Sequence, residues 1–162
     1  AHAQARPVYV RIGKSDRGDV HSAPLTADCL KRPIKVLAGR DQGPALLATG
    51  SMVKTALELA RRRWPEATVY SIPVLKPVDG VAMAELLHAH PKLVTLEEHN
   101  LAGGLGSVVA EISTTLLPRP LLRIGVNDRF SEHCGSYDYL LKEHGLDEAT
   151  IIPRVEAFLA CS

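Results

Sequence analysis

The sequence lacks the features of a membrane or exported protein. No apolar run approaches the roughly 18 residues that a membrane span needs, and the first residues, AHAQARP, contain no apolar stretch of a signal peptide. The three cysteines, Cys29, Cys134 and Cys161, are odd in number and far apart. Because no CxxC pair occurs, they predict free thiols rather than a zinc site or a redox couple. These absences predict a cytoplasmic protein.

Net charge is almost absent as well. A formal net charge of +1 gives no long-range field to attract nucleic acid or an anionic membrane, so neither is predicted as a partner. The seven histidines are scattered, without HExxH or paired spacing, and no metal site is predicted. What remains is 46% hydrophobic and 23% charged over 162 residues, a composition typical of a soluble globular protein of about one domain.

Hydrophobic periodicity predicts an amphipathic helix over residues 52–63. Its apolar positions fall at i, i+3, i+4 and i+7 of one face: Val53, Ala56, Leu57 and Ala60. Ser51 is a candidate N-cap, and three arginines in the last turn suit the negative end of the helix dipole. We interpret Arg61, Arg62 and Arg63 as a solvated helix end rather than as a basic binding patch.

Strand-like and helix-like segments alternate along the rest of the chain. Strands are predicted at 34–39, 67–72, 92–98 and 120–126, and helices at 81–89, which Asp79 would cap, and at 105–117, before two short helices. Crossovers between parallel strands are right-handed and cover the sheet. The order therefore predicts an α/β fold, a doubly wound, mostly parallel sheet with helices on both faces.

The N-terminal part differs from this pattern. Residues 7–13, PVYVRIG, suit a short strand, whereas the polar stretch that follows is broken by glycine and proline and indicates a linker. We therefore divide the chain into a tail at 1–14, a linker at 15–33 and a domain at 34–162. Because the sequence starts at Ala1 directly ahead of a strand-like run, we expect that further residues precede it.

Polar residues end the third of these predicted strands. Glu97, Glu98 and His99 lie at the carboxyl end of a predicted central strand, where open α/β sheets usually bind their ligands. A carboxylate beside an imidazole permits acid–base chemistry. Polar residues also end strands that meet solvent or an interface, which is the commoner arrangement.

A glycine-rich turn follows between that strand and the next helix. Such a turn can cradle phosphate, but its spacing is neither GxGxxG nor GxxxxGK[ST], so a tight turn that packs close to the sheet or to a partner subunit is the alternative. Its apolar character predicts that the face serves subunit contact. The candidate interface residues are Glu97, Glu98, His99, Gly103, Gly104, Leu105 and Gly106.

A run of hydrolase-like residues occurs near the end of the chain. Ser131, Glu132, His133 and Cys134 are consecutive, but a catalytic triad is defined by geometry rather than by neighbours in the sequence. We therefore predict no catalytic residue here.

Several phrases resemble the transketolase C-terminal domain in order and spacing. They are LLATGSMVKTALELA (46–60), SIPVLKPVD (71–79), VTLEEHNLAGGLGSVVAEI (94–112) and IGVNDRFSEHCGSYDYLLKEHGLD (124–147). Upstream, RPVYVRIGK (6–14) resembles the last strand of the preceding pyrimidine-binding domain. The resemblance thus covers about 120 residues and identifies the tail, 1–14, with that preceding domain.

The resemblance implies a thiamine-diphosphate-dependent transferase that moves a two-carbon ketol unit between sugar phosphates in pentose phosphate metabolism. In that family the cofactor and its Mg lie between two other domains, with a Gly-Asp-Gly…Asn motif and an activating glutamate. Neither motif occurs here. The resemblance therefore implies an assembly role within a homodimer, beside the chain's own upstream domains, with no cofactor bound by this chain alone and no activity alone.

Arg11 matches the family arginine that holds the substrate phosphate, a role that suits the planar guanidinium fork. An ordinary strand arginine facing solvent is the alternative. The stretch FSEHCG departs from the transketolase pattern, so the β-subunit of a 2-oxoacid dehydrogenase and deoxyxylulose-phosphate synthase stay open. A free-standing, non-catalytic dimerisation or binding module is the alternative of another class.

Overall fold

The computed structural model describes residues 6–10, 17–27 and 29–161. Residues 7–10, the described part of the strand expected at 7–13, have no regular secondary structure, and Val8, Tyr9 and Val10 are exposed. The rest of that segment, Arg11 included, lies outside the described residues. Within the described part of the chain, no helix is long and apolar enough to cross a membrane.

Five strands form one sheet in the order β1-β3-β2-β4-β5. They are β1 (Ile34–Leu37), β2 (Ala45–Ala48), β3 (Thr68–Ser71), β4 (Leu93–Asn100) and β5 (Leu121–Val126). Edge strand β1 runs antiparallel to β3, and every other neighbouring pair is parallel. The predicted mostly parallel sheet is confirmed.

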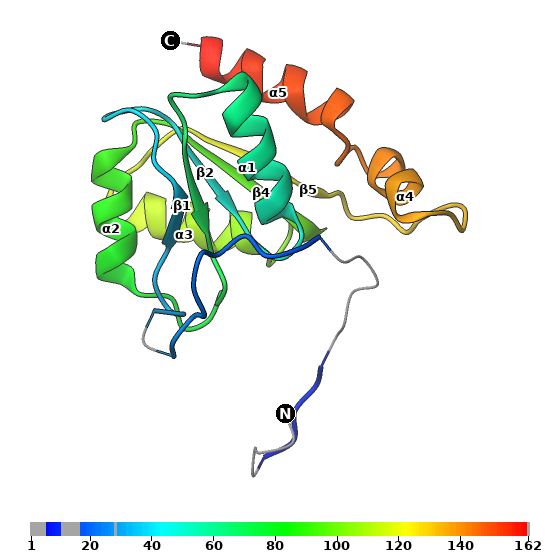
Figure 1. Cartoon of the computed structure of the whole chain (residues 1–162), viewed down its shortest axis with the longest axis horizontal. Helices are drawn as coiled ribbons and strands as arrows, with labels where there is room; N and C mark the ends of the chain where they lie inside the picture. The colour runs from blue at the N-terminus through cyan, green and yellow to red at the C-terminus, as the bar shows by residue number, and fades with distance from the viewer. Residues whose placement is uncertain (1–5, 11–16, 28, 162) are drawn as a thin grey trace.

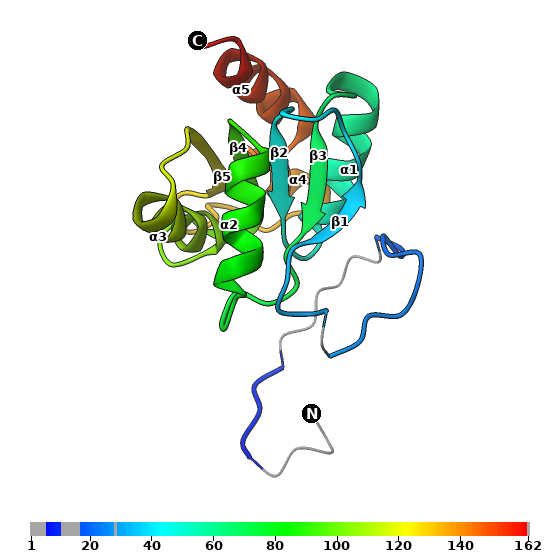
Figure 2. The ribbon, with the colours of Figure 1, turned by 90° about the vertical axis from the view of Figure 1, so that its left-hand side faces the viewer.

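Helices cover both faces of the sheet (Figures 1 and 2). They are α1 (Met52–Arg63), α2 (Gly80–Ala89), α3 (Leu105–Leu116), α4 (Tyr137–Glu143) and α5 (Glu148–Ala160). Side chains of α1 and α5 form one apolar core on their face of the sheet, and side chains of α2 and α3 form the other. This two-faced arrangement is the predicted doubly wound fold.

The helix ends show where local sequence decides the structure. Asp79 caps α2 as predicted, because its carboxylate accepts hydrogen bonds from the N–H groups of Val81 and Ala82, both at 3.0 Å. Ser51 occupies the predicted N-cap position of α1, but its side chain makes no capping bond, and its hydroxyl instead donates to Glu98. The Ser51 hydroxyl, which could have capped α1, is therefore bonded to a residue of β4.

The arginines at the end of α1 join that helix to α5. Arg62 and Arg63 are about half exposed, as a solvated helix end requires, but they also form ion pairs with Glu148 at 2.5 Å and Glu156 at 2.6 Å. Each exposed ion pair of this kind contributes little to the free energy of folding. They still indicate that the last turn of α1 faces α5 rather than a polyanionic partner.

The described residues of the predicted linker, 17–27 and 29–33, pack against the domain. Arg17 donates to the Thr55 hydroxyl on α1 at 3.0 Å, Val20 packs against the core, and the His21 ring lies 3.4 Å from the Ser71 hydroxyl. The Asp79 N–H donates to the Lys31 carbonyl at 2.9 Å. The segment thus runs along the carboxyl ends of β2 and β3 (Figure 1).

Candidate functional site at the carboxyl end of strand β4

The carboxyl ends of β2 and β4 form the point at which the sheet changes winding direction. These strands are neighbours, yet the helix that follows β2 packs on one face and the helix that follows β4 packs on the other. Open α/β sheets place ligands in the crevice at such a point. The predicted site residues Glu97, Glu98 and His99 all lie here, at the end of β4.

Glu97 is completely buried and caps helix α3. Its two carboxylate oxygens accept hydrogen bonds from the N–H groups of Leu105, at 2.6 Å, and Gly106, at 2.7 Å. The N-cap residue, Gly104, has no side chain to do this, and the first N–H groups of a helix need partners. Each oxygen of the Glu97 carboxylate therefore accepts a hydrogen bond from the helix N-terminus, whose dipole also favours a carboxylate there.

The glycines of the turn allow this close contact. A Cβ at Gly104 would collide with the Glu97 carboxylate, and one at Gly106 would collide with the side chains of Arg123 and Thr95. Gly103 has a φ of 79°, which disfavours other residues. The tight-turn interpretation fits this geometry, because the N–H groups that would cradle phosphate already donate to Glu97.

Arg123 fixes the turn that precedes α3, and it had no role in the sequence analysis. From β5, its guanidinium donates to the Leu101 carbonyl and to the Ser107 hydroxyl, the latter at 3.0 Å. The Ser107 hydroxyl donates to the Leu101 carbonyl at 2.9 Å and accepts from the Gly103 N–H at 3.0 Å. Arg123 reaches this turn because it pairs with Thr95 in the sheet. That pairing is a feature of the tertiary structure, so the sequence alone did not indicate the role of Arg123.

Glu98 belongs to the other side of the sheet. Its carboxylate accepts hydrogen bonds from the Ser51 hydroxyl and, at 3.0 Å, from the Tyr137 hydroxyl of α4. The Arg17 guanidinium lies 5.9 Å from the centre of the Tyr137 ring. Burial raises the pKa of Tyr137, which further favours the protonated phenol that donates this hydrogen bond. Glu98 thus joins β4 to the N-terminus of α1 and to α4.

The remaining interface candidates differ in exposure. Gly104, Leu105 and Gly106 are buried within the domain, whereas His99 and Gly103 are exposed. Leu105 belongs to the core between the sheet, α2 and α3. Only part of the predicted interface is therefore available to another chain. Its most accessible portion is the turn from His99 to Gly103.

The hydrolase-like run forms a different contact from the one its sequence suggests. Ser131 is exposed and its hydroxyl lies 2.8 Å from Nε2 of His144, rather than next to His133. Ser131 lies on the loop between β5 and α4, where Phe130 is 97% exposed, and His144 directly follows α4. We assign no catalytic role to them.

The described residues do not fit a diphosphate and metal site. Within them, no group of three or more histidine, cysteine, aspartate or glutamate side chains is placed to hold a metal ion. The buried carboxylate at the strand end, Glu97, is bonded to backbone N–H groups. No reaction step through thiamine diphosphate can be derived from the side chains of this domain.

Comparisons with known proteins place the fold. The family model described as the transketolase C-terminal domain matches residues 29–151. A solved structure described as a split-gene transketolase, an inactive β4 tetramer, aligns with a TM-score of 0.74 and 32% identity over 88% of this chain and 45% of that chain.

Three similar curated relatives share one name. The 1-deoxy-D-xylulose-5-phosphate synthase of Thioalkalivibrio sulfidiphilus is 42% identical over 76% of this chain and 19% of its own length. The synthases of Chlorobium luteolum and Pseudomonas putida are 39% and 36% identical over 94% and 98% of this chain. They are much longer proteins, of which the chain spans 24% and 25%. The family match covers well over half of the 162 residues, and the chain belongs to the transketolase C-terminal domain family.

Proposed function

We propose that this chain is the assembly domain of a thiamine-diphosphate-dependent enzyme that acts on sugar phosphates. One observation carries the proposal: the strand-end carboxylate expected at a ligand site, Glu97, is buried and caps α3. A buried carboxylate that accepts hydrogen bonds from the N-terminus of a helix has a structural role and is not placed for acid–base chemistry on a ligand. The catalytic groups and the cofactor, with its Mg, then belong to other domains of the intact, cytoplasmic enzyme.

Between the two sugar-phosphate activities, the curated relatives favour 1-deoxy-D-xylulose-5-phosphate synthase, because three of them match 76–98% of this chain under that name. Transketolase is the second candidate, which the structural neighbour favours at 32% identity. Assays of both activities on the intact enzyme, loaded with thiamine diphosphate and Mg, separate the two. A synthase should form the deoxypentulose phosphate, and a transketolase should exchange a ketol unit between sugar phosphates.

The isolated 162-residue chain should not bind thiamine diphosphate. The described residues provide no metal cluster, and the turn N–H groups are already bonded. Isothermal titration calorimetry with the cofactor and Mg should therefore give only heats of dilution. Stoichiometric binding with a dissociation constant on the order of micromolar would contradict the assembly assignment.

The upstream partner is proposed from the N-terminal segment. Residues 1–14 are assigned to the preceding pyrimidine-binding domain and 15–33 to the connection, with Arg11 as the candidate ligand of the substrate phosphate. The segment that begins at Arg17 lies on α1 and reaches α2, which supports a fixed connection between the two domains. A homodimer through the turn from His99 to Gly103 completes the proposed assembly.

A further inference from the structure

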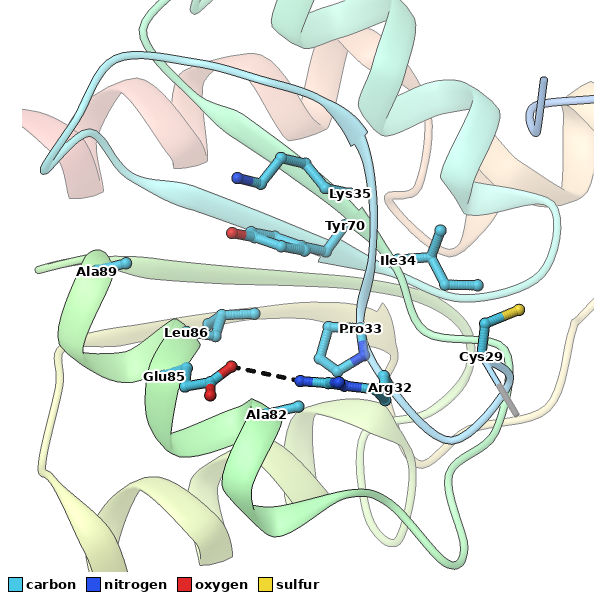
Figure 3. Close-up of a pocket in the computed structure, with 10 residues that line it drawn as sticks. All are labelled: Cys29, Arg32, Pro33, Ile34, Lys35, Tyr70, Ala82, Glu85, Leu86 and Ala89. Atoms are coloured by element: carbon cyan, nitrogen blue, oxygen red, sulfur yellow. Dashed lines mark hydrogen bonds and ion pairs between the residues drawn. The ribbon is translucent and has the colours of Figure 1, made fainter. Parts of the chain in front are cut away.

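A groove of about 490 Å³ opens between edge strand β1 and helix α2, away from the site at β4 (Figure 3). The segment before β1 contributes one wall, through Arg32 and Pro33, and α2 contributes the opposite wall. This volume lies within the range of pockets that hold small molecules.

The floor of the groove is largely apolar. It includes the ring of Tyr70 and the side chains of Leu86 and Ala82, all largely buried. The Tyr70 hydroxyl already bonds to Nε2 of His90 at 3.0 Å. What Tyr70 adds to the groove is therefore an aromatic surface rather than a polar group.

The two cations on the rim of the groove differ in their partners. Arg32 is shared between two carboxylates, Glu85 at 3.4 Å and Asp79 at 3.6 Å. Lys35, on the other side of the groove in Figure 3, forms no ion pair among the described residues, and its ammonium lies 5.9 Å from the centre of the Tyr70 ring. The four charges sum to zero, and Lys35 is the cation among them that has no carboxylate of a described residue within ion-pair distance.

The groove borders a sheet edge, but the edge is protected against strand addition. The register of β1 against β3 is irregular between Lys35 and Leu37, and an exposed lysine occupies the strand. Irregularities and lysines on edge strands hinder pairing with another chain. These features favour a small molecule over an extended peptide as the occupant.

We propose that this groove binds a small organic anion with a flat, apolar body, such as an aromatic carboxylate. The body lies on Tyr70 and Leu86, and the anionic group faces the ammonium of Lys35. The proposal is independent of the proposed function, since none of these residues belongs to the site at β4.

The experiment is a two-dimensional ¹H–¹⁵N NMR titration of the 162-residue chain with indole-3-acetate. Amides of Lys35, Tyr70 and Leu86 should shift saturably, with a dissociation constant on the order of 1 mM, as expected for about 13 non-hydrogen atoms. Indole-3-acetamide has the same ring without the charge and should bind about fivefold more weakly. Inorganic phosphate, an anion without a flat body, should leave these amides unshifted.

Variants test the role of the charge. Lys35→Gln should weaken indole-3-acetate about fivefold and leave indole-3-acetamide unchanged. Lys142→Gln removes the same charge from an exposed position on α4 and should change neither affinity. The proposal is overturned if the groove amides stay unshifted at about 10 mM indole-3-acetate, if the neutral amide binds equally well, or if phosphate alone reproduces the shifts. An unchanged affinity in Lys35→Gln overturns it as well.

Discussion

Glu97 occupies a position where one carboxylate satisfies two backbone groups. Replacing Glu97 with alanine leaves the N–H groups of Leu105 and Gly106 without their acceptors. Unsatisfied buried donors are costly, so we expect the free energy of unfolding to fall by about 2 to 4 kcal/mol. Urea unfolding followed by far-UV circular dichroism measures this loss.

Glu111→Gln is the matched control, because Glu111 lies exposed on the same helix. The free energy of unfolding of this variant should lie within about 0.5 kcal/mol of that of the parent chain. If Glu97→Ala cost no more than the control, Glu97 would not be the structural cap of α3. In that case its carboxylate would be available for another role.

Arg11 concerns the intact enzyme, since the proposed phosphate site needs the preceding domain. Arg11→Ala should lower kcat/KM for phosphorylated sugars by an amount equivalent to about 1.5 to 3 kcal/mol, the loss of a charge-assisted contact. Steady-state kinetics with unphosphorylated substrates provide the control, because these have no phosphate to lose. Equal losses of kcat/KM for both substrate types would contradict the phosphate-binding role and favour an ordinary strand arginine.

Several elements meet at His90, the residue that follows α2. Its Nδ1 lies 2.8 Å from the Gly43 carbonyl, which can only accept, so Nδ1 carries the proton. The Tyr70 hydroxyl on β3 then donates to Nε2 at 3.0 Å. Burial lowers the pKa of His90, Lys35 lowers it further, and the Gly43 bond opposes this change.

A lowered pKa makes stability depend on pH. Below about pH 6.5 the unfolded chain takes up a proton at His90 that the folded chain resists, until the pH reaches the lower folded pKa. Stability from this group is complete above the unfolded pKa and falls as the pH decreases through that window. We therefore expect the stability advantage of the parent chain over His90→Gln to shrink between about pH 7 and 5.

Urea unfolding at several pH values checks this expectation. His88→Gln, at an exposed position in the same helix, is the control and should follow the parent chain across the window. A constant difference between the parent chain and His90→Gln would mean that His90 titrates alike in both states.

Elements were more predictable than the contacts between them. Periodicity predicted both ends of α1, and the capping preference of aspartate predicted the start of α2, because these signals are local. Ser51 is at the predicted N-cap position without a capping bond for the opposite reason: its hydroxyl donates to Glu98, 47 residues away. The roles of Glu97 and Arg123 likewise depend on which strands lie side by side.

Self-association is argued from the exposed turn between β4 and α3. Leu105 is unsuited to test it, since the side chain is 1% exposed and a change there would disrupt the core. Ala102 is exposed beside Gly103, and Ala102→Glu should place a charge in the proposed contact. We expect about a tenfold weaker dimer by sedimentation equilibrium, from one desolvated and unpaired charge.

Ala149→Glu on α5 adds the same charge at another exposed position and should leave the dimer unchanged. A parent chain that sediments as a monomer at high concentration would remove the support for this interface in the isolated domain. Equal weakening by both variants would indicate general repulsion between charged chains rather than contact at the turn.

Arg17 and the end of α5 lie at opposite ends of the strands of the sheet (Figure 1). Arg17 lies at the carboxyl ends of the strands, whereas Lys92, just before β4, donates to carbonyls at the end of α5. A helix of 13 residues extends about 20 Å, which adds to the separation. A reporter or affinity tag fused after α5 would leave the β4 turn unobstructed.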